Sequence, residues 1–434
     1  MHTQVLRIRC ECIARTVSPR VNIIYIEEHG ACITHRTGYS GHRTIAFLIA
    51  NRTKHFTGAK TTSQNPSIWF AGIPGNSELT TAINRFLAAC GWFDCVRDRK
   101  AADYTLEGKD EGKTFLLYLK MGGASAGAWR FSKGSSSRSS AKSAVDTIIE
   151  KSFKELKVKG FCRSKIAFCA RTAPGVSNIY TCDIDGHDME QVTFFRALCV
   201  EPCWTPRGLS ICYSKYGRTG IDVLETTIAK PRRSRLISGS QGINAGASVS
   251  PDGKYMAVIR SPDHQVDIYV IELASGRKRR LTRDKAVEAS PCWSPDGKYV
   301  FYVSDESGRP RIIRHELATN HRRRMPTVGS DAVTPDCSAD GKVAYATRVN
   351  GRYTIAVYDP RKGDNKQVIR LPGEWESPGW AADNRQLVCK RTWKGKQELY
   401  VIDTWSGNTR LLVSPSVPVS MPSWSQCEPK TGVR

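Results

Sequence analysis

The chain has 434 residues, of which 40% are hydrophobic, and this length is enough for two or three domains of roughly 100–200 residues each. Such a composition supports packed cores and excludes a chain that is disordered throughout. No stretch approaches the ~18 consecutive apolar residues of a membrane-spanning helix, so we expect a soluble or peripheral protein. The net charge of +24 favours anionic partners, unless it only keeps the surface solvated.

Residues 1–60 contain no periodic hydrophobic pattern from which a strand or helix is predicted. The run Thr44–Ala50 resembles a very short signal core, but it lies far from Met1 and no Ala-x-Ala cleavage site follows it. We interpret residues 1–60 as a divergent leader or a mispredicted start, with a disordered extension as the alternative.

Residues 61–160 are expected to form a small α/β domain. One helix is predicted to begin near Asn76, because Leu79, Ile83, Phe86 and Leu87 follow at spacings that place them on one helical face. The other predicted elements are strands at residues 67–73, 102–108 and 114–120 and a second helix at residues 140–156.

A repeated motif related to Ser-Pro-Cys-Trp-Ser-Pro-Asp-Gly decides the architecture of residues 161–426. Its tryptophan position recurs every 43 to 45 residues, which is the period of a propeller blade. Each unit contains four predicted strands, with a tight Pro-Asp-Gly turn after the first. The tryptophan position is occupied in turn by Trp204, Val249, Trp293, Cys337, Trp380 and Trp424.

The two ends of the repeat array complement one another. The last unit contains only the strand of Trp424, and three predicted strands at residues 165–170, 177–183 and 189–195 precede the first repeated tryptophan. Together they make a sixth blade and close the ring, which removes sheet edges that would invite aggregation. The sequence therefore predicts a mainly β fold: a six-bladed β-propeller preceded by a small α/β domain, with residues 427–434 as a tail.

The 15 cysteines are an odd number and show no CxxC or HxxxH pairing typical of metal sites. Most lie in apolar, strand-like runs such as residues 165–169. We expect small buried residues rather than metal ligands or a disulfide framework, because cysteine is among the most buried residue types. No metal and no cofactor are expected.

The order of a small α/β domain and six Pro-x-Trp-Ser-Pro-Asp-Gly blades resembles the TolB family, soluble periplasmic components of the Tol–Pal envelope system. The resemblance covers residues 66–426 and is most marked over residues 291–317. It implies a non-enzymatic periplasmic scaffold whose propeller binds the peptidoglycan-associated lipoprotein Pal. Such a scaffold helps to hold the outer membrane to the cell wall, including during division. The resemblance also implies TolA binding by a segment after the signal peptide, although residues 61–65 show no recognisable one. A monomer is expected.

The same resemblance implies which residues contact Pal. A propeller binds at one mouth of its channel, through the connections from outer strands to the next inner strands. Trp375 is the expected anchor, since aromatic side chains dominate many interfaces; the alternative is that it packs on a neighbouring blade. The connections are expected at residues 196–202, 239–247, 284–290, 328–334, 373–378 and 414–421. The implied contact residues are Ile243, Asn244, Gly246, Glu288, Ala289, Asp331, Trp375 and Glu376.

Basic clusters recur in phase with the repeat, at residues 232–235, 277–280, 322–324 and 361–366. They fall at the third turn and fourth strand of each unit, so a hoop of positive charge is predicted around the outside of the propeller. We expect a weak, salt-sensitive attraction to anionic envelope surfaces. Nucleic acid is a poorer candidate, because aromatic residues are not interleaved as stacking platforms.

The segment Gly123–Gly127 matches the Gly-x-Ser-x-Gly nucleophile elbow, which needs a strand, a sharp turn and a helix behind the serine. A strand-like run follows it instead, so a hairpin is the better interpretation and no catalytic residue is assigned. Two alternatives stay open: a propeller hydrolase or lyase with its site in the channel, and a propeller that binds sugars or peptidoglycan fragments. His264 or His315 beside carboxylates would favour the first, and exposed tryptophans at the mouth would favour the second.

Overall fold

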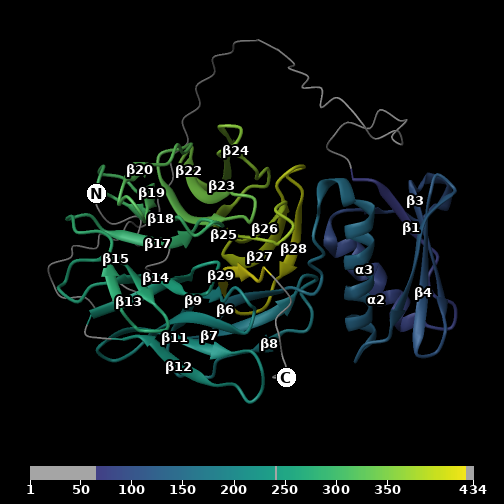
Figure 1. Ribbon diagram of the computed structural model, residues 1–434, viewed down its shortest axis with the longest axis horizontal. Coiled ribbons are helices and arrows are strands. Elements are labelled where there is room, and N and C mark those ends of the chain that lie inside the picture. The colour runs from purple at the N-terminus through teal and green to yellow at the C-terminus, as the bar shows by residue number, and fades with distance from the viewer. Residues whose placement is uncertain (1–64, 240–241, 427–434) are drawn as a thin grey trace, which may run out of the picture.

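The computed structural model describes residues 65–239 and 242–426. The predicted leader, with its run Thr44–Ala50, and the predicted tail at residues 427–434 lie outside the described residues. Figure 1 shows a small α/β domain beside a larger body of strands, with the two helices of the small domain lying between its sheet and that body. Within the described residues, no helix is long and apolar enough to cross a membrane.

The α/β domain contains one five-stranded sheet and two helices packed against each other. The segment Gly123–Gly127 begins in the turn of an antiparallel hairpin and continues into its second strand, as expected, and no helix follows it directly. The strand order is β2 (Asp94–Cys95), β1 (Ser67–Phe70), β3 (Tyr104–Asp110), β4 (Thr114–Met121) and β5 (Ala124–Ser132). The helices are α2 (Ser77–Cys90), α3 (Ser137–Ser152) and the short 3₁₀ turns η1 (Arg99–Ala101) and η2 (Lys154–Leu156).

Local chemistry explains where α2 begins and ends. The side chain of Asn76 accepts a hydrogen bond from the backbone N–H of Leu79, which satisfies one of the unpaired donors of the first turn. Gly91 follows the helix in the left-handed conformation, the usual way to end a helix. The predicted apolar face is confirmed, because Ile83 and Phe86 are fully buried.

The larger body is a propeller-like arrangement of antiparallel sheets. Four sheets have four strands each, and an eight-stranded sheet contains two such groups, joined where β11 pairs in parallel with β13. In five of the four-stranded groups the strands follow one another in chain order, and in the sixth the last strand of the chain precedes three early ones. The first strands are β6 (Lys165–Ala173), β7 (Val176–Asp183), β8 (Glu190–Gln191), β9 (Cys199–Trp204), β10 (Ser210–Tyr216), β11 (Gly220–Thr227), β12 (Ser234–Ser238), β13 (Gly242–Val249), β14 (Tyr255–Arg260), β15 (Asp267–Glu272) and β16 (Lys278–Arg280). The others are β17 (Glu288–Trp293), β18 (Tyr299–Ser304), β19 (Arg311–Glu316), β20 (Arg322–Arg324), β21 (Ala332–Cys337), β22 (Val343–Val349), β23 (Arg352–Asp359), β24 (Asp364–Gln367), β25 (Glu374–Trp380), β26 (Gln386–Trp393), β27 (Lys396–Asp403), β28 (Thr409–Val413) and β29 (Val419–Trp424).

Strands from the two ends of the propeller segment complete one sheet. β29 pairs antiparallel with β6, and β7 and β8 continue the same sheet. Beyond the strand pair, the backbone N–H of Ser425 donates to the carbonyl of Lys165 at 2.9 Å. This confirms the predicted joining of the Trp424 strand with the three strands that precede the first repeated tryptophan.

Three of the repeated tryptophans link their inner strand to the one before it. The indole N–H of Trp293 donates to the carbonyl of Ser248 at 2.9 Å, and that of Trp380 donates to the carbonyl of Asp336 at 3.1 Å. Trp204 makes the same bond to the last inner strand, at the carbonyl of Ser423. Each acceptor is the residue just before the tryptophan position of the preceding repeat. The period of the sequence is therefore the period of a contact between neighbouring sheets.

The α/β domain is held firmly against the β25–β28 sheet. The guanidinium of Arg385 contacts the rings of both Trp92 and Trp405, 4.6 and 4.5 Å from their centroids, and the two rings meet edge-on at 5.5 Å. The indole N–H of Trp92 donates to the buried carboxylate of Asp383 at 3.0 Å. Arg385 also pairs with Asp403 at 2.6 Å. Trp92 is buried at 2% exposure and Trp405 is 47% exposed, so the ring from the α/β domain is covered while the propeller ring stays half open to solvent.

Candidate partner-binding mouth of the propeller

Every inner strand bends at the same point of the repeat. A register shift interrupts its pairing with the second strand of its sheet, and one residue there adopts a positive φ. Five of the six are not glycine, although a side chain in this conformation costs about 1–2 kcal/mol. The residues are Glu201 (φ 58°), Gly246 (62°), Ser290 (53°), Thr334 (49°), Ser377 (52°) and Met421 (51°). The same bulge thus recurs once in each repeat.

The residues implied as contacts cluster beside these bulges. Seven of them lie within inner strands, and Asp331 directly precedes β21. All six expected connections are therefore partly wrong, because an inner strand begins inside each of them: β9 in 196–202, β13 in 239–247, β17 in 284–290, β21 in 328–334, β25 in 373–378 and β29 in 414–421. The backbone in these parts of the segments pairs with a second strand instead of forming a loop.

Most of these side chains are buried. Asn244 is 0% exposed, Glu288 and Trp375 are 1% exposed, Asp331 is 4% exposed and Ala289 is 7% exposed. Gly246 is buried as well, whereas Ile243 and Glu376 are partly exposed. Inner strands converge toward the propeller axis, so their side chains are covered by neighbouring strands. Only two of the eight side chains are open to a partner in this structure.

Trp375 is a packing residue rather than the exposed anchor expected from the sequence. Its indole N–H donates to the carbonyl of Leu371 at 3.1 Å. Its ring meets Tyr400 edge-on at 5.3 Å, and the guanidinium of Arg391 lies 5.5 Å from its centroid. The expectation of an anchor is wrong for this conformation, because the strand places the ring between neighbouring strands rather than above the mouth.

Glu288 is a buried carboxyl in an acidic surrounding. Its Oε2 accepts a short hydrogen bond from the hydroxyl of Thr282, which also lies 3.1 Å from the carboxylate of Asp267. Burial, reinforced by the nearby charges of Asp284 and Asp267, raises the pKa of Glu288 to about 9. The side chain is therefore protonated at neutral pH and adds no negative charge to the mouth.

The remaining polar residues of this set hold the strands together. The side-chain oxygen of Asn244 accepts hydrogen bonds from Ser238 at 2.9 Å and from Arg260 at 3.0 Å. Glu376 pairs with Lys390 at 2.8 Å. At the neighbouring bulge, Glu201 accepts a hydrogen bond from the backbone N–H of Gly246 at 2.8 Å. These contacts fix the inner strands relative to their neighbours.

The exposed residues of the mouth were missed by sequence reasoning. Phe194 is 70% exposed in the connection from β8 to β9, and Leu371 is 42% exposed in the connection from β24 to β25. In the described parts of the outer-to-inner connections, every exposed charged side chain is basic. These side chains are Arg196, Arg283, Lys285 and Arg370. A large apolar residue shortly before a predicted inner strand was the signal available in the sequence.

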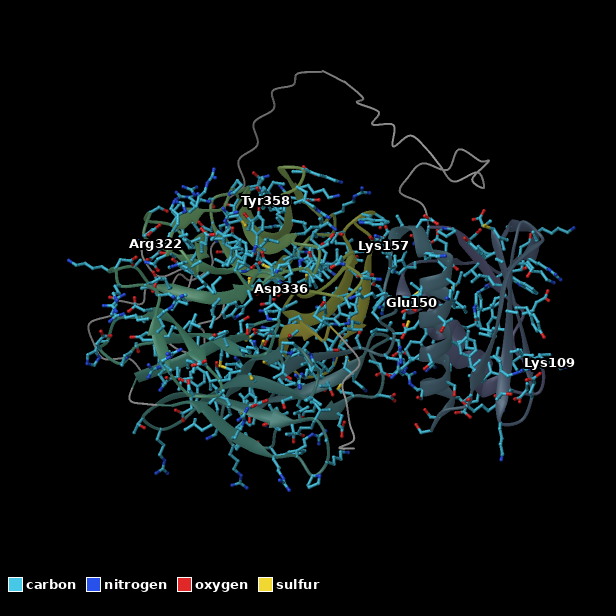
Figure 2. All side chains as sticks on the ribbon, in the orientation of Figure 1. Lys109, Glu150, Lys157, Arg322, Asp336 and Tyr358 are labelled. Carbon is cyan, nitrogen blue, oxygen red and sulfur yellow. The ribbon has the colours of Figure 1, made fainter. Side chains whose placement is uncertain are left out.

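The basic clusters lie on the outer strands, as predicted. β16 and β20 are the outermost strands of their sheets, and their side chains are mostly exposed. Figure 2 shows Arg322 at the margin of the propeller that faces away from the α/β domain. Part of the charge is neutralised, since Arg322 pairs with Asp284 at 2.6 Å and Arg280 pairs with Asp263 at 2.7 Å. Arg323 and Arg324 stay exposed.

The histidines considered for catalysis do not meet carboxylates in the channel. His315 is buried in β19, where its Nε2 lies 2.9 Å from the side-chain oxygen of Asn320 and burial lowers its pKa. His264 lies in an exposed turn between β14 and β15. Among the residues that the structure describes, no group of three His, Cys, Asp or Glu side chains is placed to hold a metal ion.

Comparison with known proteins agrees with this architecture. The family model described as the TolB beta propeller domain matches residues 154–428. A Tol-Pal system protein TolB from Desulfosudis oleivorans is 29% identical over 124 residues, and one from Francisella tularensis subsp. holarctica is 32% identical over 139 residues. These alignments cover 29% of this chain in both cases, and only 28% and 30% of the relatives' lengths.

A solved structure resembles both domains together. The crystal structure of TolB from Acinetobacter baumannii superposes with a TM-score of 0.76, covering 83% of this chain and 97% of the other. Its sequence identity of 21% supports a shared fold and no more. Because the family model spans the whole propeller and more than half of the chain, the protein belongs to the family of the TolB beta propeller domain.

Proposed function

We propose that this protein is a non-enzymatic, periplasmic scaffold of a Tol–Pal system. In this proposal the propeller binds a Pal-like lipoprotein at its mouth and thereby supports outer-membrane integrity and cell division. The observation that carries the proposal is the match of the TolB propeller family over residues 154–428. The names of the two relatives, both Tol-Pal system proteins, support the same assignment.

We propose six blades for the propeller, spanning residues 161–426, after an α/β domain at residues 61–160. The support is the grouping of strands: four separate four-stranded sheets, and two more groups within the eight-stranded sheet. The parallel pairing that joins those two groups involves only Gly220 with Gly242 and Ile221 with Ile243. Six bulges at one repeat position support the same count.

The proposed contact surface consists of the exposed side chains on the connections, with the eight expected residues beneath it. Phe194 and Leu371 supply apolar area, and Ile243 and Glu376 lie partly open beside them. The other six expected residues are buried beneath this surface and support the backbone of the inner strands. Because the exposed charges on these connections are basic, the matching face of the lipoprotein should be acidic.

A TolA-like inner-membrane protein is the second proposed partner. The resemblance to the TolB family implies a TolA contact in a segment near the start of the mature chain. The residues before Asn65 lie outside the described part of this structure. The proposal therefore rests on family membership alone. Co-purification of the full chain with a TolA-like domain tests it, and binding that survives deletion of residues 1–64 would contradict the assignment to that segment.

Contact with anionic envelope surfaces is proposed as a weak secondary function. The exposed guanidinium groups of Arg323 and Arg324 on an outermost strand favour it. Sedimentation with phosphatidylglycerol vesicles should decrease from low to high salt, since exposed charges are screened. Binding that does not change with salt, or that is unaffected by Arg323→Ala with Arg324→Ala, would remove this proposal.

The two alternative functions lose their expected support. The repeated tryptophans are at most 7% exposed, so they offer no stacking surface for a sugar at the mouth. His264 and His315 lie outside any carboxylate cluster of the channel, as described above. A scaffold remains the better-supported proposal than a sugar-binding propeller or a propeller hydrolase.

Calorimetric titration of the full chain with the Pal-like lipoprotein domain of the same organism tests the main proposal. Phe194→Ala combined with Leu371→Ala should weaken binding by about tenfold or more, as expected when exposed apolar anchors are truncated. Leu236→Ala is the matched control, because this residue is 60% exposed on the outer strand β12. Absence of binding at tens of micromolar would refute the Pal assignment, and an equal effect of the control would refute the location.

A further inference from the structure

Two inner strands lack the repeated tryptophan: one carries Val249 at that position, and the other carries Cys337. Trp293 and Trp380 donate to the carbonyl of the residue before the repeat position of the preceding strand. Cys337 occupies that tryptophan position in β21. By the same rule, the residue that faces it on the preceding strand β17 is Cys292. The structure places these two side chains in contact, with 3.5 Å between their sulfur atoms.

We propose that Cys292 and Cys337 form a disulfide bond that joins two neighbouring sheets of the propeller. Both are thiols in this structure, and the bond requires the sulfurs to approach from 3.5 Å to about 2.05 Å. Side-chain rotation and a small shift of two adjacent strands can supply this movement. The disulfide takes the place of the tryptophan hydrogen bond at the junction of β17 and β21.

The oxidation follows ordinary thiol–disulfide exchange. Cys337 is the partly exposed member of the pair and Cys292 is 6% exposed, so the Cys337 thiolate attacks a small disulfide oxidant and releases one thiol. The Cys292 thiolate then attacks the sulfur of Cys337 and displaces the second thiol. The protein loses two hydrogen atoms and the oxidant disulfide is reduced to two thiols. An oxidising compartment, as proposed for this protein, supplies such oxidants.

The disulfide would close a covalent loop between two residues that are 45 positions apart in the chain. A cross-link of this length removes conformational freedom from the unfolded state, so Tm should rise by several degrees on oxidation. The bond would hold the β17–β20 and β21–β24 sheets together where the usual tryptophan is missing. This inference is independent of Pal binding, because it concerns the inner strands and a purified protein tests it.

Peptide mapping of the full chain provides the test. The protein is purified with reductant, exposed to oxidised glutathione, blocked with iodoacetamide and digested with trypsin without reduction. Trypsin releases residues 286–298 and 325–342, which contain one cysteine each, so a linked pair has an unambiguous mass. Recovery of this linked peptide, lost after reduction, is expected. Recovery of both peptides in alkylated form, or linked to other cysteines, would overturn the proposal.

Variants separate the specific bond from general oxidation. Oxidised glutathione should raise the Tm of the wild-type protein and of Cys95→Ser, which removes an exposed thiol in the α/β domain. The shift should disappear in Cys337→Ser. Cys292→Ala provides a second test that does not depend on the folding of the first variant. A redox-dependent shift that persists in either variant of the pair would contradict the assignment.

Discussion

Glu288→Gln tests whether a buried carboxyl at the mouth is protonated. The carboxyl is 1% exposed, and burial raises its pKa from 4.5 to about 9. Because the folded-state pKa is raised, the stabilisation is fully present below the unfolded-state pKa of 4.5. It decreases as the pH rises from there toward 9, because the unfolded chain releases this proton first.

The magnitude follows from the distance between the working pH and the unfolded pKa. Between pH 4.5 and pH 7 the wild-type protein should lose up to about 3 kcal/mol, at about 1.4 kcal/mol per pH unit. Glutamine has a similar shape and no titrating proton, so it avoids this loss. With an allowance for imperfect hydrogen bonding to Thr282, Glu288→Gln should stabilise the protein by about 1–3 kcal/mol at pH 7.

Urea unfolding followed by tryptophan fluorescence at several pH values measures this difference. The gain of the variant over the wild type should grow from pH 5 to pH 8 and become small near pH 4.5. Glu155→Gln controls for the loss of a carboxylate at an exposed position in η2, and it should change stability by less than about 0.5 kcal/mol. A variant that is less stable than the wild type at pH 7, with the same pH slope, would refute a protonated Glu288.

Three further substitutions test the packing of the fold. Arg385→Ala removes a cation that contacts two indole rings and leaves Asp403 without its ion-pair partner, so urea unfolding should show a loss of about 3–5 kcal/mol. Arg385 also lowers the pKa of Asp403, so this contribution should be lost in the wild type as the pH falls through that lowered pKa. Trp380→Phe removes an indole donor between inner strands, and calorimetry should show a loss of about 1–3 kcal/mol. Gly186→Ala would place a Cβ 2.2 Å from the carbonyl oxygen of Leu412 at φ +80°, so thermal unfolding should show a clear loss of Tm. Wild-type stability in any of these variants would contradict the corresponding contact.

The sequence by itself determined the repeating architecture. The tryptophan spacing defined the inner strands, and the Trp424 strand was correctly joined to the strands before Trp204. The turn after each inner strand followed from Ser-Pro-Asp-Gly, where Ser294 donates to Asp296 at 2.6 Å and Gly297 has a φ of 70°. The turns depend on local backbone preferences, which a few neighbouring residues determine. The strand assignment depends on periodicity, which is visible when the repeats are aligned.

Tertiary structure alone decided which residues reach the surface and which touch each other. Trp375 is hidden and Phe194 is exposed, although both precede or begin inner strands. Trp92 meets Asp383 across 291 positions of the chain, and Cys337 meets Cys292 across 45. The physical reason is that exposure depends on how closely strands from different repeats converge at the axis, and on where a second domain covers them. Neither is encoded within a single repeat.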